Sequence, residues 1–140
     1  MSLRARLAAT TTEPAPSAAL ALLRVAFGGT LALVHGWGKV ADLGGFTAKV
    51  AQLFPLPEVL GPFAAFSELA GGALVALGLL TRPAAAAVLL TMLGAAFVVH
   101  GGDPFARREL ALAYAAAALA LAVAGGGRWS LDALVWGRRG

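Results

Sequence analysis

The sequence predicts an all-α membrane protein, a polytopic four-helix bundle with a short interfacial helix between its first two spans. Apolar residues make up 59% of the 140 residues and charged residues only 13%, which is about half of the share of about 25% usual in soluble domains. Four apolar stretches are long enough to cross a bilayer core, which takes about 20 helical residues. The length allows one domain.

The predicted spans carry few charged side chains. They cover about residues 17–37, 59–80, 83–99 and 108–124. The third span has no polar side chain except Thr91, so it lacks the polar stripe of a helix in a soluble bundle. Gly and Ala are abundant in all four, and small residues let membrane helices pack closely. These features predict a transmembrane domain over residues 17–136.

The segments outside the spans differ in character. Residues 1–16 contain the stretch TTTEPAP in place of a continuous apolar run, which predicts a disordered leader and not a signal peptide. Between the first two spans, Leu43, Phe46 and Val50 recur at spacings of three and four. This spacing predicts a short amphipathic helix in the membrane interface, with a loop packed on the bundle as the alternative. Residues 137–140 form a basic tail.

The composition excludes several classes of function. The chain has no cysteine, so disulfides, thiolate redox chemistry and Fe–S ligation by its own side chains are excluded. Its net charge is +4, but the basic residues are scattered between apolar runs and do not form the basic face of a nucleic-acid-binding protein. No nucleic acid is therefore expected as a partner.

The basic residues predict the orientation in the membrane. Four spans place both termini on one side. That side holds Arg4, Arg6, Arg82, Arg128, Arg138 and Arg139. The opposite side holds Lys39, Lys49, Arg107 and Arg108. Because basic residues favour the cytoplasmic side, we expect a multi-pass protein of the inner (plasma) membrane with both termini in the cytoplasm.

Two charged residues, Arg24 and Glu68, fall inside the predicted spans. A charge at the bilayer centre costs about 2.5–3.5 kcal/mol or more. The number of residues between each charge and the end of its span places both at mid-membrane depth. This predicts a buried ion pair between them. The alternative is that Arg24 reaches the inner headgroups while Glu68 is protonated. Glu68 shares a helix face with Gly61, Ala65 and Gly72, so we expect it to point into the bundle.

A polar line continues from Arg24 towards the outer surface. Arg24 and His35 are nearly three helical turns apart and share a face, and Lys39 follows one turn later. The first and third spans run in the same direction, so His35 and His100 end them at similar depth. The predicted outer polar cluster contains His35, Lys39, His100, Asp103, Glu109 and Tyr114.

Several ligands compete for this cluster. Two histidines can ligate haem, and together with Asp103 or Glu109 they can bind a divalent metal. A quinone headgroup suits the residues better, because it needs hydrogen-bond donors beside an apolar pocket. Its candidate contacts are His35, Lys39, His100 and Tyr114. The same side chains also suit plain anchoring of helix ends at the interface. The residues identify no catalytic group and no metal ligand set.

Several motifs follow one another in a recognisable order. The first span and its exit read LLRVAFGGTLALVHGWGKV, the second span and its turn read FSELAGGALVALGLLTRPAA, and GGGRWSLD follows the fourth span. The strongest motif is the Glu-x-x-Gly-Gly of Glu68, Gly71 and Gly72. Over residues 18–133 the chain resembles the DoxX family of small four-helix membrane proteins of bacteria and archaea.

The resemblance implies a redox role connected with quinones. Family members resemble a subunit of an archaeal thiosulfate:quinone oxidoreductase, and others are associated with quinone resistance or with a membrane complex that counters oxidative and thiol stress. We therefore expect a quinone-linked redox subunit, or a quinone-binding component of a membrane oxidoreductase system. Its expected cofactor is a quinone, and its expected partners are the lipid bilayer and a redox protein. The alternative is a non-catalytic membrane scaffold or assembly factor that binds a partner protein or further copies of itself.

Overall fold

The computed structural model describes residues 10–137, and these residues form helices joined by short connections, without any strand. Three helices are long and apolar enough to cross a membrane: Pro14–Ala41, Pro57–Leu77 and Thr81–Val99. A further long helix, α8 (Phe105–Ala124), carries Arg107, Arg108 and Glu109 near its start, which makes it less apolar than the other three. The all-helical fold expected from the sequence is therefore present, with three candidate membrane-spanning helices among residues 10–137 in place of the four expected.

The long helices consist of several consecutive segments. The first contains α2 (Pro14–Thr30), the π-helical η1 (Leu31–Gly36) and α3 (Trp37–Ala41). The second contains α5 (Pro57–Phe66), the π-helical η2 (Ser67–Gly71) and α6 (Gly72–Leu77). The third contains α7 (Thr81–Gly94) and the π-helical η3 (Ala95–Val99). Two short helices, α4 (Leu43–Val50) and α9 (Leu131–Trp136), lie outside the long ones.

The first helix begins earlier than the predicted span. Pro14 stands at its start, where a proline costs nothing because the first helical N–H groups have no partner within the helix. The hydroxyl of Thr10 accepts a hydrogen bond from the Gly127 N–H at 2.9 Å. Residues 10–16 are thus part of the fold and not of a disordered leader. Residues 1–9 of the predicted leader and 138–140 of the predicted tail lie outside the described residues.

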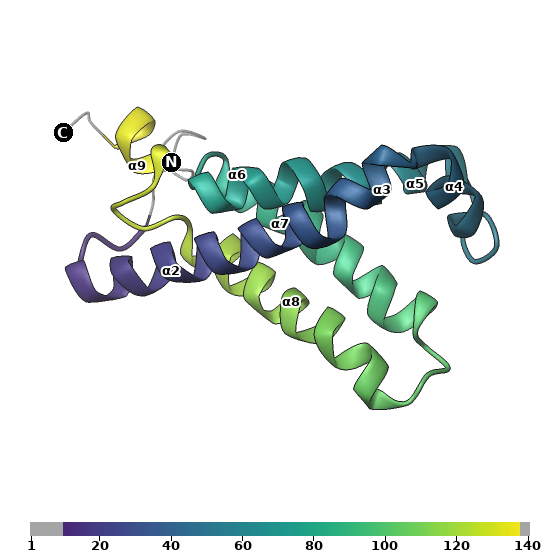
Figure 1. Ribbon diagram of the computed structural model, residues 1–140. Helices are drawn as coiled ribbons and strands as arrows, with labels where there is room; N and C mark the ends of the chain where they lie inside the picture. Colours follow the sequence, from purple (N-terminus) through teal and green to yellow (C-terminus); the bar gives the residue numbers. More distant parts are fainter. Residues whose placement is uncertain (1–9, 138–140) are drawn as a thin grey trace.

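The first two long helices lie side by side and run in opposite directions, while α7 and α8 form a second antiparallel pair that crosses them (Figure 1). Glycines permit the closest approach between the first two helices. A Cβ atom at Gly28 would overlap the backbone of Gly72 and Ala76, and one at Gly36 would overlap the backbone of Glu68 and Leu69. These contacts fix the register of the two helices.

The buried core lies between α2, α6, α7 and α8 and is built largely from small residues. Its largest members are Phe27, Leu31, Val75, Val88, Met92 and Leu121, with alanines between them. Many large apolar side chains instead face outwards, among them Leu22, Val25, Leu33 and Leu90. A soluble monomer rarely exposes so much contiguous apolar surface, so these faces suit contact with lipid.

The segment after α8 closes the end of the bundle at which α2 starts and α6 ends (Figure 1). Asp132 of α9 is 3% exposed and accepts hydrogen bonds from the N–H groups of Leu80, at 2.7 Å, and Thr81, at 2.9 Å. Leu80 has a φ of 50°, a left-handed conformation that costs a non-glycine residue about 1 kcal/mol or more. Asp132 therefore caps α7 and helps to hold a strained turn.

Candidate ligand-binding cavity

The three π-helical segments lie one in each of the first three long helices. A π-helical turn contains an extra residue relative to an α-helix and often marks a functional site. η1 precedes α3 and Lys39, η2 contains Ser67 and Glu68, and η3 is followed by His100. Lys39, Glu68 and His100 therefore lie within or just after these irregular turns.

Lys39 and Glu68 form an ion pair across the first two helices. Lys39 Nζ lies 2.5 Å from both carboxylate oxygens of Glu68. The Glu68 side chain is 2% exposed and that of Lys39 is 30% exposed, so the buried carboxylate has a partner that is still partly accessible. The ammonium group also lies 5.2 Å from the centre of the Phe46 ring, in a cation–π contact. Glu68 points into the bundle, as its small-residue helix face predicts.

The predicted ion pair between Arg24 and Glu68 is wrong. Arg24 is 2% exposed and donates to the carbonyl oxygens of Ala76, at 3.1 Å, and Trp129, at 3.0 Å. Gly36 is the residue that meets Glu68 across the helix contact, and Arg24 lies twelve residues before it, or ~18 Å along the helix axis. Counting depth from the span ends could not give this register, because the glycine contacts set it.

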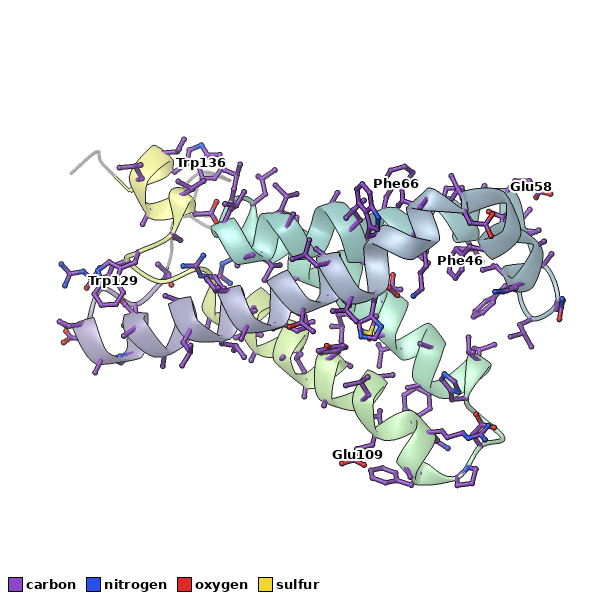
Figure 2. The ribbon with its side chains drawn as sticks, in the orientation of Figure 1. Phe46, Glu58, Phe66, Glu109, Trp129 and Trp136 are labelled. Atoms are coloured by element: carbon purple, nitrogen blue, oxygen red, sulfur yellow. The ribbon has the colours of Figure 1, made fainter. Side chains whose placement is uncertain are left out.

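A cavity of about 520 Å³ opens beside the Lys39–Glu68 pair, at the end of the molecule opposite α9. Its walls come from α3, α4 and the loop after α4, from the second helix, and from the last part of the third. Most of the lining is apolar, including Phe46, Val50, Phe54, Leu60, Phe63 and Leu90. Figure 2 shows Phe46 beneath the turn that joins α3 to α4.

A few polar side chains also line the cavity. These polar lining residues are Lys39, Lys49, Glu68, Thr91 and His100. The Thr91 hydroxyl lies 2.5 Å from that of Ser67. His100 pairs through Nδ1 with Asp103 Oδ2 at 2.8 Å, and this contact orients the imidazole ring. The cavity therefore combines apolar walls with polar groups at separate points.

The structure divides the four candidate headgroup contacts into two pairs. Lys39 and His100 line the cavity, whereas His35 and Tyr114 do not. The rings of His35 and Tyr114 meet edge to face, with centroids 5.7 Å apart, and Tyr114 also contacts Phe27. Glu109 is exposed on α8 and points away from the bundle (Figure 2). The residues of the predicted outer cluster therefore do not meet at one site but take part in several separate contacts.

The cavity includes residues that the candidate set omits. Lys49 and the aromatic walls at Phe46 and Phe54 belong to α4 and the loop after it. The spacing of apolar residues between the first two spans, which predicts a short helix there, could have identified these residues. The apolar face of that helix, α4, forms one wall of the cavity. Within residues 10–137, no group of three or more His, Cys, Asp or Glu side chains is placed to hold a metal ion.

Comparison with known proteins identifies a family. The family model described as DoxX matches residues 19–101, a stretch that begins in α2, ends just after η3 and contains Lys39, Glu68 and His100. No curated protein and no solved structure matches the chain significantly.

Proposed function

Because the chain belongs to the DoxX family of membrane proteins, we propose that it binds a quinone in the cavity beside Lys39 and Glu68. In this role it acts as a quinone-linked redox subunit, or as a quinone-binding component of a membrane oxidoreductase system, together with a redox partner protein. The observation that carries the proposal is an apolar cavity with a lysine and a histidine in its lining.

The size and chemistry of the cavity support a quinone ring. Its volume of about 520 Å³ is within the range of about 300–1,000 Å³ typical of small-molecule sites. Phe46, Phe54 and Phe63 offer flat apolar surfaces for a ring, and Lys39 and His100 can hydrogen-bond to its carbonyl oxygens. We propose Lys39 and His100 as the headgroup contacts and leave His35 and Tyr114 outside the site.

The proposal includes an arrangement in the membrane. α8 forms a fourth span, with Arg107 and Arg108 at the outer headgroups, and α4 lies in the outer interface with its apolar face towards the bundle. Both termini are then cytoplasmic in the plasma membrane, in agreement with the distribution of basic residues. The cavity lies near the outer leaflet, where a quinone headgroup can reach it from the lipid.

Quinone binding to the purified protein in lipid nanodiscs tests the proposal. We expect His100→Phe to weaken binding about tenfold, which corresponds to about 1.4 kcal/mol. The pair variant Lys39→Met/Glu68→Gln should do the same without leaving an unpaired buried charge. His35→Phe is the matched control, because it makes the same replacement outside the cavity and should leave the affinity unchanged. If both cavity variants bound quinone with wild-type affinity, the cavity would not be the quinone-binding site.

A membrane scaffold or assembly factor is the second candidate. The exposed apolar faces of the first helix, including Leu22, Val25 and Trp37, suit a partner helix as well as lipid. A lipid extract of the purified protein separates the two functions. Bound quinone supports the redox role, whereas a stoichiometric protein partner with no extracted quinone supports the scaffold.

A further inference from the structure

The charged residues of the cavity lining do not balance. Two lysines, Lys39 and Lys49, face one carboxylate, Glu68. Lys39 donates to both carboxylate oxygens of Glu68, which neutralises its charge and leaves one of its three N–H groups for a ligand oxygen. Lys49 makes no hydrogen bond or ion pair with any residue of the described part of the chain. The lining therefore carries an excess positive charge, which belongs to Lys49.

The surroundings of Lys49 increase the effect of this charge. Lys49 is an exposed residue, but Phe46, Val50 and Leu53 line the cavity with it, and apolar walls lower the local dielectric constant and strengthen the interaction of the ammonium group with an anion inside the cavity. The nearest acidic residues in sequence, Asp42 and Glu58, do not line the cavity. An anionic group that enters the cavity thus meets a cation without a competing partner.

His100 adds a second polar contact. Its Nδ1 is held by Asp103, and its Nε2 has no hydrogen-bond partner among residues 10–137. When the imidazole ring carries both protons, Nδ1 donates to Asp103 and Nε2 can donate to a carbonyl oxygen of the ligand, while an adjacent ionised oxygen pairs with Lys49. Lys49 and His100 lie at separate points of the lining, so a ligand with two oxygens can engage both.

We propose that the cavity prefers an anionic ligand, an apolar body that carries an ionised oxygen, over a neutral molecule of the same size. This inference rests on the proposed function and narrows it, since a quinone with an acidic hydroxyl group is a ligand of this kind. A fatty-acid carboxylate has the same chemistry without the ring. The preference is set by Lys49, because Lys39 is already neutralised by Glu68.

Two naphthoquinones of equal size test the preference. 2-Hydroxy-1,4-naphthoquinone is an anion at neutral pH, and 2-methyl-1,4-naphthoquinone is neutral. We expect the wild-type protein in nanodiscs to bind the hydroxy compound about tenfold more tightly, after subtraction of partitioning into empty nanodiscs, because one ion pair is worth roughly this factor. Lys49→Gln should abolish the preference without changing the affinity for the methyl compound, and Lys49→Arg should restore it.

Arg107→Gln is the matched control, because it removes an exposed cation from the same end of the molecule but outside the cavity; it should preserve the preference. Equal binding of the two quinones by the wild type would overturn the inference and leave the proposed function intact. Failure of both quinones to bind would overturn the proposed function. If dodecanoate bound as tightly as the hydroxy compound, the preference for an anionic ligand would stand. The proposal that the cavity recognises a quinone ring would then be wrong.

Discussion

At the scale of single residues, the Lys39–Glu68 pair shows how this bundle tolerates a buried charge. Glu68 is almost fully enclosed, but its partner reaches the cavity, so the two sites do not respond equally to substitution. Removing Lys39 leaves the Glu68 carboxylate without a partner in an apolar interior, and a buried unpaired charge lowers the stability of the fold. Removing the charge of Glu68 leaves Lys39 free to turn towards the cavity.

This asymmetry gives a prediction for stability. We expect Lys39→Met to lower the free energy of unfolding by about 2 kcal/mol or more. Glu68→Gln should cost clearly less, and the double variant Lys39→Met/Glu68→Gln should recover most of the loss. Unfolding in detergent, analysed as a double-mutant cycle, measures the coupling. Additive effects of the two substitutions would contradict the pairing.

Asp132 supplies a second prediction, at the opposite end of the molecule. Asp132→Ala removes the acceptor for two backbone N–H groups at the start of α7 and should destabilise the protein by about 1–2 kcal/mol. Asp132→Asn keeps one acceptor oxygen and should cost less. The midpoint of thermal unfolding reports both values. If the two variants matched the wild type, the cap would have no stabilising role.

At the scale of helices, the close contact at Gly36 controls the geometry of the ion pair. An alanine at Gly36 must push the first helix away from the backbone of Glu68 and Leu69. Overpacking of this kind costs about 1–3 kcal/mol. We expect Gly36→Ala to lower stability by that amount and also to weaken ligand binding, because Lys39 follows in the next turn.

Gly38 is the matched control for this substitution. It lies two residues further along the same helix, and a Cβ atom there would meet nothing within 4 Å. Gly38→Ala should therefore stabilise the protein slightly, by about 0.5–1 kcal/mol from its higher helix propensity, and should leave binding unaffected. A loss of stability in Gly38→Ala as large as that in Gly36→Ala would show that the close helix contact is not responsible.

The sequence predicted the elements better than their register. Length and apolarity located the long helices, three of which are candidate spans, and the spacing of Leu43, Phe46 and Val50 located α4. The π-helical turns could not be predicted, because segments such as Ala95–Val99 have ordinary helical composition. The partners of Arg24 and Glu68 depend on contacts between distant glycines. Local patterns therefore identified the polar residues but not which of them meet.

At the scale of the whole molecule, the proposed topology can be mapped directly, because the chain has no cysteine of its own. Thr12 and Gly102 are both exposed and lie on opposite sides of the membrane in the proposed arrangement. A membrane-impermeant maleimide should label Gly102→Cys in intact cells and Thr12→Cys only after permeabilisation. Labelling of both sites from outside would contradict the three crossings that the proposed arrangement places between them.

The π-helical turn before Lys39 has a consequence for how this protein tolerates changes in length. A π-helical turn amounts to one inserted residue, so deletion of one residue within Leu31–Gly36 would let the backbone relax into a regular α-helix. Because the π-helical turn already absorbs that residue, the helix after the deletion would keep its orientation, and Lys39 would still face Glu68. A deletion in the regular α-helix before it would instead rotate everything that follows by about 100° around the helix axis and turn Lys39 away from Glu68. A single-residue gap within Leu31–Gly36 in a related sequence is therefore compatible with the same ion pair and the same cavity.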